Sequence, residues 1–245
     1  MENVAQIFFH GSLNDFLPRH EKGKWQAYSF TGAPALKDAL EAVGVPHPEI
    51  GRICQNGSEA GFQEALLRHA QVEVFPVVSE KGSQTPGPLQ VSVPTPPTFV
   101  LDVHLGKLAR YLRLLGFDTL YETSYDDQTI ARLAQQGQRI VLTRDIGLLK
   151  QKIIQWGYWL RSQQWEEQLR EVMIRYGLKD QLQPFTRCMA CNGEIGEVSK
   201  ETVLPLLPPK TRLYFHVFYQ CQSCHRVYWK GSHYDRMQSF LAQFS

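Results

Sequence analysis

Four cysteines stand in two Cys-x-x-Cys pairs near the end of the chain: Cys188 with Cys191, and Cys221 with Cys224. A two-residue spacer aims both thiolates of a pair at one point, and two pairs form a tetrahedral zinc site with Zn–S distances of about 2.3 Å. Four thiolates leave no open coordination position, so we predict a structural zinc. Redox cysteines or buried small residues are the alternatives. His225 is expected to be an exposed neighbour of the site.

A second set of reactive side chains is acidic. Asp102 lies in or at the end of an apolar segment, Asp145 follows another such segment after one arginine, and Asp127, with Asp126 beside it, starts the helical stretch between them. The carboxyl ends of parallel strands share one edge of a sheet, so we expect these carboxylates to converge there. Their mutual repulsion would raise their pKa values unless a hard divalent cation, Mg²⁺ or Mn²⁺, neutralised them.

Each aspartate taken singly has a simpler explanation. Asp127 and Asp145 are good helix caps, and Asp118 after Gly-Phe is typical of a turn. Asp102 is harder to explain this way, because a carboxylate within an apolar strand is costly without a partner. The combination, rather than any one member, therefore predicts a metal site.

Basic side chains accompany these aspartates. Lys107, Arg110 and Arg113 recur at a helical spacing of three, and Arg144 immediately precedes Asp145. They are candidates for holding RNA phosphates on either side of a cleaved bond. A solvated helix face is the alternative for Arg110 and Arg113.

The rest of the sequence indicates what positions these groups. A proline- and glycine-rich stretch favours an extended linker, and the segments before it follow the strand, strand, helix, strand, strand order of a β-grasp. After it, strands alternate with helices, which implies a parallel sheet covered on both faces. The predicted domains are a β-grasp at 1–80, a linker at 81–97, an α/β domain at 98–184 and a zinc ribbon at 185–245.

Composition restricts the class of protein. The 245 residues are 43% hydrophobic, enough for two or three compact units, and no apolar run reaches the roughly 18–20 residues needed to cross a bilayer. With two cysteine pairs and no secretion signal visible, we expect a cytoplasmic protein that uses its thiols for metal. From residue 98 onward 19 Lys and Arg face 14 Asp and Glu, so the rear is basic and suits a polyanion.

The motifs together resemble a known family. The stretch Asp102-Val-His-Leu-Gly-Lys-Leu-Ala-Arg-Tyr-Leu-Arg-Leu-Leu-Gly-Phe-Asp118, the pair Asp126-Asp127, the segment Ile140-Val-Leu-Thr-Arg-Asp145, the cysteine pairs and Tyr228-Trp-Lys-Gly-Ser-His233 are similar to the Mut-seven C-terminal ribonucleases. The resemblance implies a ubiquitin-like β-grasp domain, a PIN-like nuclease domain and a zinc ribbon.

It also implies metal-dependent RNA hydrolysis by Asp102, Asp127 and Asp145, with Asp126 or Asp118 as further members of the site. Lys230 and His233 become candidates for contacting RNA. PIN-like enzymes commonly have a fourth acid after the next strand, whereas this chain has Gln163 there and no acid until Glu166. We therefore expect a metal-dependent endoribonuclease; the alternative is a non-catalytic RNA- or ribosome-binding adaptor, which the missing acid favours.

The front domain resembles ubiquitin-like sulfur carriers, which need a free Gly-Gly carboxyl terminus. This chain instead continues through Val77-Val78-Ser79 into the linker. We therefore expect the domain to dock a protein or ribosome partner, or to position RNA. The sequence predicts no oligomeric state.

Overall fold

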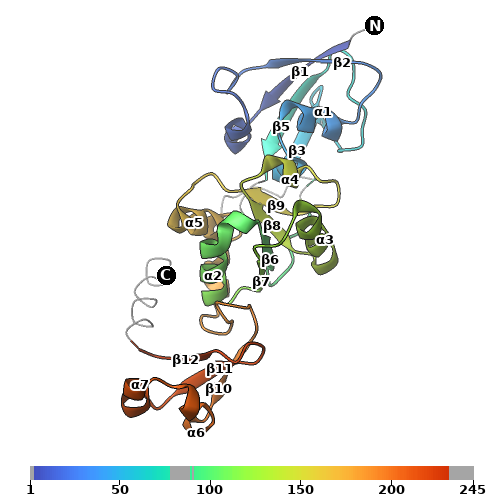
Figure 1. Ribbon diagram of the computed structural model, residues 1–245. Helices are drawn as coiled ribbons and strands as arrows, with labels where there is room; N and C mark the ends of the chain where they lie inside the picture. Colours follow the sequence, from blue (N-terminus) through green and yellow to red (C-terminus); the bar gives the residue numbers. More distant parts are fainter. Residues whose placement is uncertain (1–2, 78–88, 90, 232–245) are drawn as a thin grey trace.

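The computed structural model describes residues 3–77, 89 and 91–231, and in them the chain forms three sheets that follow one another in sequence (Figure 1). His233 and much of the linker predicted at 81–97 lie outside the described residues. No helix among the residues described has the length and apolar character needed to cross a membrane.

The first sheet is a mixed β-grasp sheet of order β2-β1-β5-β3-β4, in which β1 runs parallel to β5 and antiparallel to β2. Alternate residues of β1 point inward, and α1 lays Leu36 and Leu40 on the same core. The Asn56-Gly57 turn joins β3 to β4. The elements are β1 (Asn3–Phe9), β2 (Gln26–Phe30), α1 (Leu36–Val43), β3 (Ile50–Gln55), β4 (Ser58–Ala60) and β5 (Gln71–Pro76), with 3-10 helices η1 (Gly11–Phe16) and η2 (His47–Glu49).

The central domain has a four-stranded, all-parallel sheet of order β7-β6-β8-β9. Its strands have two to four residues each, and β7 is the shortest with two. The elements are β6 (Phe99–Leu101), η4 (Val103–Leu105), α2 (Gly106–Leu114), β7 (Thr119–Leu120), α3 (Asp127–Gly137), β8 (Ile140–Thr143), α4 (Ile146–Leu149), β9 (Gly157–Trp159), α5 (Trp165–Arg175) and η5 (Leu178–Gln181).

Both faces of this sheet are buried, as the continuous apolar strands require. Phe99 and Leu101 belong to the core under α2 and α5, whereas Val100 between them belongs to the core under α3 and α4. Successive residues of a strand point to opposite faces, so one three-residue strand serves both cores.

The third part is an antiparallel sheet, β10-β11-β12, that carries the cysteine pairs at its turns. Two short α-helices and one 3-10 helix interrupt the long connection between β10 and β11. The elements are β10 (Ile195–Val198), α6 (Lys200–Val203), η6 (Leu204–Leu206), α7 (Pro209–Tyr214), β11 (Phe218–Cys221) and β12 (Val227–Trp229). The predicted fold class, an α/β PIN-like domain between a β-grasp domain and a cysteine-bearing ribbon, is confirmed.

Candidate metal sites and nucleic-acid surface

The ends of β6 and β8 bring two of the predicted aspartates together. Asp102 directly follows β6, and Thr143 is the last residue of the neighbouring strand β8. The Thr143 hydroxyl donates to Asp102 Oδ2 at 2.9 Å and accepts from the Asp145 amide at 2.8 Å. Thr143, which the sequence analysis did not single out, therefore ties the two aspartates to one edge; a hydroxyl at the end of an otherwise apolar strand was the available signal.

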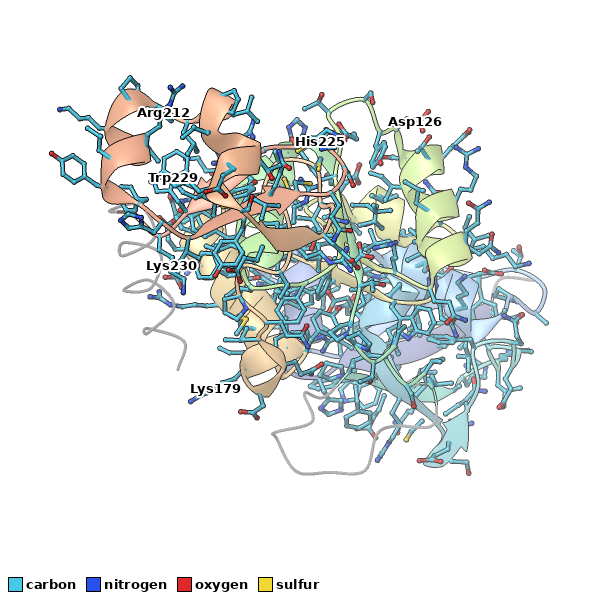
Figure 2. The ribbon with its side chains drawn as sticks, turned by 90° about the horizontal axis from the view of Figure 1, so that it is seen from below. Asp126, Lys179, Arg212, His225, Trp229 and Lys230 are labelled. Atoms are coloured by element: carbon cyan, nitrogen blue, oxygen red, sulfur yellow. The ribbon has the colours of Figure 1, made fainter. Side chains whose placement is uncertain are left out.

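Asp126 and Asp127 have different roles at the start of α3. Asp126 is the N-cap, its Oδ1 accepting from the Thr129 amide at 2.8 Å, and its side chain lies in solvent (Figure 2). Helix capping accounts for the position of Asp126, so we leave it out of the site proposed below. Asp127 is the first helical residue and is not the cap. Burial and then the negative charges of Asp145, Asp102 and Asp126 raise the pKa of its carboxyl group.

Asp102, Asp127 and Asp145, called the carboxylate rim below, thus form one electrostatic neighbourhood. In the parts of the chain that the structure covers, no lysine or arginine forms an ion pair with any of the three. Asp145 also accepts from the Gly147 amide at 2.6 Å. A group of carboxylates without a basic partner, in which nearby negative charge helps to raise the pKa of Asp127, is the donor set that a hard divalent cation suits. The carboxylate oxygens of the three aspartates are not all within 4.8 Å of one another. Among the described residues, the four cysteines are the only group of three or more potential metal ligands that lie that close together.

Two of the predicted phosphate contacts lie on the accessible side of α2. Lys107 and Arg110 are exposed, and Lys107 lines a pocket of about 290 Å³ with His104, Gln163 and Gln164. The pocket begins two residues after Asp102. The two glutamines occupy the region where a fourth acid is expected in PIN-like enzymes, so neutral hydrogen-bonding groups stand there instead.

The other two predicted phosphate contacts are structural. Arg113 is 3% exposed, and its guanidinium donates to the carbonyls of Thr119 at 2.9 Å and Ala190 at 2.8 Å. Burial lowers its pKa, against the attraction of nearby acidic groups. It joins α2 to the ribbon and is not placed to meet RNA. Lys107, Arg110 and Arg113 are three residues apart, and this spacing spreads them over a wide arc of the helix surface. Arg113, the last of them, therefore faces the interior of the protein.

Arg144 is also committed within the protein. Its Nη1 lies within hydrogen-bond distance of the carbonyl oxygens of Leu160, Arg161 and Ser162, at 3.0, 2.8 and 2.6 Å. Arg144 therefore braces the loop between β9 and α5, because a cation satisfies carbonyls that have no partner in the sheet. This corrects its prediction as a phosphate contact.

Asp118 lies at the opposite end of the sheet from the carboxylate rim. It precedes β7, and Arg139, its partner at 2.8 Å, precedes β8. Its Oδ1 also accepts from Asn192 Nδ2 at 2.8 Å. Burial raises the pKa of Asp118, but these partners together hold it below its ordinary value. The suggestion that Asp118 joins the catalytic set is wrong.

The four cysteines of the ribbon form one compact cluster. Cys188 Sγ lies 3.6 Å from Cys224 Sγ, and Cys191 Sγ lies 3.4 Å from Cys221 Sγ. Tetrahedral zinc at Zn–S distances of about 2.3 Å requires sulfurs about 3.8 Å apart, so the cluster could bind zinc with little adjustment. His225 is exposed and outside the cluster.

The ribbon also carries Lys230, which is exposed beside Trp229 (Figure 2). Lys230 lines a groove of about 370 Å³ together with Tyr219, Tyr228 and Trp229. Aromatic rings beside a cation are the elements of a surface for unpaired nucleotides. His233, the other predicted contact of this stretch, lies outside the described residues.

The fold and the rim define a PIN-like α/β domain with a cysteine ribbon. The family model of the Mut7-C RNAse domain matches residues 97–241, and that of the Mut7-C ubiquitin domain matches residues 2–81; the chain belongs to the Mut7-C RNAse domain family. The predicted family is thereby confirmed. Neither a curated protein nor a solved structure matches the chain.

Proposed function

We propose that the protein is a metal-dependent endoribonuclease that hydrolyses RNA phosphodiester bonds at the carboxylate rim. The observation that carries the proposal is the group of Asp102, Asp127 and Asp145 with no basic partner among the residues described, in a chain of a ribonuclease-domain family. Mg²⁺ or Mn²⁺ bound there would polarise the phosphodiester and lower the pKa of an attacking water.

The residues around the rim have separable tasks in this proposal. The Thr143 hydroxyl fixes the orientation of Asp102 through the bond to Oδ2 and leaves Oδ1 without a hydrogen-bond partner in the described structure. Lys107 and Arg110 attract and align the RNA backbone, and Lys230 extends this surface along the ribbon. The four cysteines hold a structural zinc that stabilises the ribbon.

A non-catalytic RNA-binding adaptor is the competing function. The neutral Gln163 and Gln164 at the fourth-acid position favour it. The unpaired acidic rim opposes it, because carboxylates repel RNA and an adaptor gains nothing from keeping them together.

The discriminating experiment is cleavage of a mixed pool of structured and single-stranded RNAs, with and without Mn²⁺, by wild type and Asp102→Asn. The proposal expects Mn²⁺-dependent cleavage that falls by at least about 10²-fold in the variant. RNA binding by both proteins with no cleavage by either would establish the adaptor. Equal cleavage by both would assign the activity to a contaminant.

A further inference from the structure

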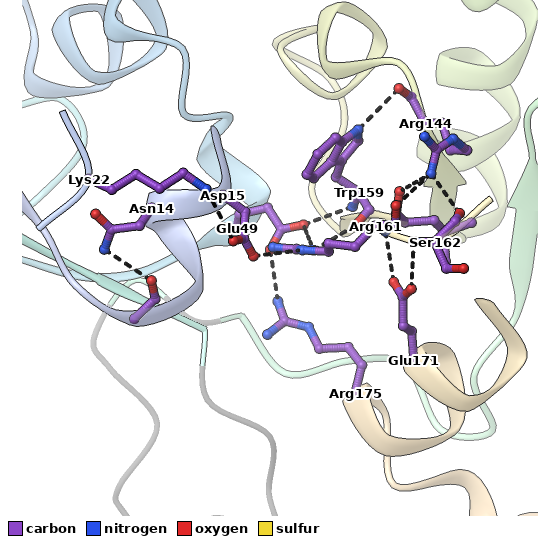
Figure 3. A network of polar contacts seen from close by, with 12 residues as sticks. Asn14, Asp15, Lys22, Glu49, Arg144, Trp159, Arg161, Ser162, Glu171 and Arg175 are labelled. Carbon is purple, nitrogen blue, oxygen red and sulfur yellow. Dashed lines mark hydrogen bonds and ion pairs between the residues drawn. The ribbon is translucent and has the colours of Figure 1, made fainter. Parts of the chain in front are cut away.

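The β-grasp domain closes the open edge of the central sheet with one buried carboxylate. Glu49, at the end of η2, is 1% exposed, and its Oε1 accepts from the Trp159 amide of edge strand β9 at 2.8 Å (Figure 3). The same carboxylate binds Arg161 Nη1 at 3.1 Å and lies 4.0 Å from Arg175 Nη2. Glu49 belongs to one domain and all three partners belong to the other.

This arrangement fixes how the two domains meet. A buried carboxylate is costly unless it is paired and hydrogen-bonded, and Glu49 obtains those partners only in the docked arrangement. At the other end of β9, His47 Nε2 lies 2.7 Å from the Ile154 carbonyl oxygen, and Lys150 Nζ donates to the Glu41 carbonyl at 2.6 Å. The β-grasp domain is therefore held both before β9 and at the end of that strand.

The contact continues from β9 to the carboxylate rim through Trp159. Its indole ring packs on Phe16 of the β-grasp domain, with centroids 5.1 Å apart, and its Nε1 donates to the Arg144 carbonyl at 3.1 Å. Arg144 is the residue before Asp145. Trp159 thus contacts the β-grasp domain through its amide and its ring, and the residue that follows β8 through its indole N–H.

The loop that follows β9 is braced from both sides. The Glu171 carboxylate accepts from the amides of Arg161 and Ser162, each at 2.8 Å, while Arg144 Nη1 gathers the carbonyls of residues 160–162 (Figure 3). The side chain of Arg161, anchored on Glu49, is part of the same loop. Movement of the β-grasp domain would therefore loosen both the loop at residues 160–162, which the Arg144 side chain binds, and the Arg144 main chain, which Trp159 binds.

We infer that the β-grasp domain positions the catalytic rim of its own chain, with Glu49 and Trp159 as the positioning residues. The inference rests on the proposed ribonuclease function. It assigns the domain a task inside the molecule: docking on β9 sets the path of residues 144–145 and with it the direction of the Asp145 carboxylate. Mere protection of an exposed strand edge is the alternative.

The test uses the full-length chain and two pairs of matched variants. Glu49→Gln removes the charge that faces the arginines; Glu73→Gln makes the same change at a glutamate paired with His10, 2.9 Å away, within the β-grasp domain. Trp159→Phe keeps a ring for Phe16 but removes the indole N–H; Trp156→Phe does the same at a tryptophan whose N–H reaches the Ser92 carbonyl instead. Amide hydrogen exchange at residues 157–163, Mn²⁺ affinity by electron paramagnetic resonance, and kcat and KM for RNA are measured for each.

Glu49→Gln is expected to speed exchange at 157–163, to weaken Mn²⁺ binding about tenfold and to lower kcat about tenfold with KM within twofold. Trp159→Phe should weaken Mn²⁺ binding and lower kcat without speeding exchange at the other amides of β9. In the double variant Glu49→Gln/Trp159→Phe, the loss of Mn²⁺ affinity and kcat should be smaller than the product of the two single losses. Both residues act through the same contact between the β-grasp domain and Arg144. Both control variants should behave as wild type.

The inference is overturned if Glu49→Gln speeds exchange but leaves Mn²⁺ affinity and kcat unchanged, because the domain would then only cover the edge. It is also overturned if exchange does not change at all. If wild type binds Mn²⁺ but cleaves no RNA, the proposed function fails while Mn²⁺ affinity in the variants still decides the inference. Absence of Mn²⁺ binding in every protein overturns both.

Discussion

Asn192, in the first knuckle of the ribbon, accepts a hydrogen bond of 2.9 Å from the main-chain amide of Thr119 on β7. β7 is one edge of the central sheet, and Glu49 caps β9 at the other edge in the same way. A side-chain oxygen from each flanking domain thus satisfies an edge amide that the four strands leave unpaired. Unpaired edges invite pairing with other chains, and here one amide of each edge is bonded within the molecule.

Loss of the zinc proposed for the ribbon is therefore expected to affect the central sheet. Cys191→Ser should abolish stoichiometric zinc, lower the melting temperature by about 5 °C or more and speed amide exchange at Thr119, because Asn192 lies next to the altered ligand. Metal analysis, calorimetry and exchange measure the three effects. Cys54→Ser, at the buried cysteine of the β-grasp domain, is the control and should keep its zinc. A well-folded, zinc-free wild type would refute the assignment.

Adjacent aspartates at the start of α3 are expected to respond differently to the same substitution. Asp127→Asn should reduce Mn²⁺-dependent cleavage by about 10²-fold, whereas Asp126→Asn should keep both activity and stability near wild type, because asparagine caps a helix about as well as aspartate. Initial rates and thermal unfolding separate the two variants. Equal loss of activity would return Asp126 to the catalytic set.

The raised pKa of Asp127 predicts a stability effect in metal-free protein. The folded state binds this proton more tightly than the unfolded state, so ionisation of Asp127 opposes folding at neutral pH and the opposition disappears as pH falls through its folded pKa. Asp127→Asn should therefore unfold at a higher temperature than wild type at pH 7, with the gap closing below pH 3.8. Saturating Mn²⁺ should reverse the order.

Asp118 is expected to have the opposite effect on the pH dependence of stability, because its pKa is lowered. Arg139 and Asn192 hold its pKa below the ordinary value, so its carboxylate stabilises the fold above pH 3.8 and that contribution is lost as pH falls through the folded pKa. Asp118→Asn should lower the melting temperature at pH 7 without changing kcat. A loss of kcat with unchanged stability would contradict its placement at the far end of the sheet.

The exposed and the buried basic residues of α2 are expected to have different effects when they are replaced. Lys107→Ala and Arg110→Ala are each expected to weaken RNA binding and to reduce the salt dependence of log K by roughly one charge. Arg113→Met should leave that slope unchanged and destabilise the protein, since it strands the carbonyls of Thr119 and Ala190. Binding titrations at several salt concentrations and thermal unfolding measure both effects.

Local patterns in the sequence were sufficient to predict the class of fold and which of the candidate metal-binding residues lie near one another. The spacing of the cysteines predicts one cluster, and the apolar segments ending near Asp102 and Asp145 predict a shared edge; both juxtapositions are present. Such predictions succeed where the geometry of a knuckle or a parallel strand determines which residues meet.

Contacts between distant parts of the chain could not be predicted in this way. Arg113 and Arg144 look like solvent-facing cations in sequence, yet each meets carbonyls contributed by segments whose positions depend on the assembled fold. Glu49 carries no local signal at all, because its importance comes from Trp159, Arg161 and Arg175 in the next domain. Charge in the sequence therefore did not distinguish arginines that bond the main chain of the protein from exposed basic residues that are candidates for contacting RNA.

Anomalous diffraction from crystals soaked in Mn²⁺ tests the proposed rim site most directly, recorded on either side of the manganese edge and with the zinc proposed for the cysteine cluster as an internal reference. We expect a manganese peak bounded by the carboxylates of Asp102, Asp127 and Asp145, absent in Asp102→Asn. Saturating Mn²⁺ with no peak at the rim, while the zinc peak is present, would contradict it.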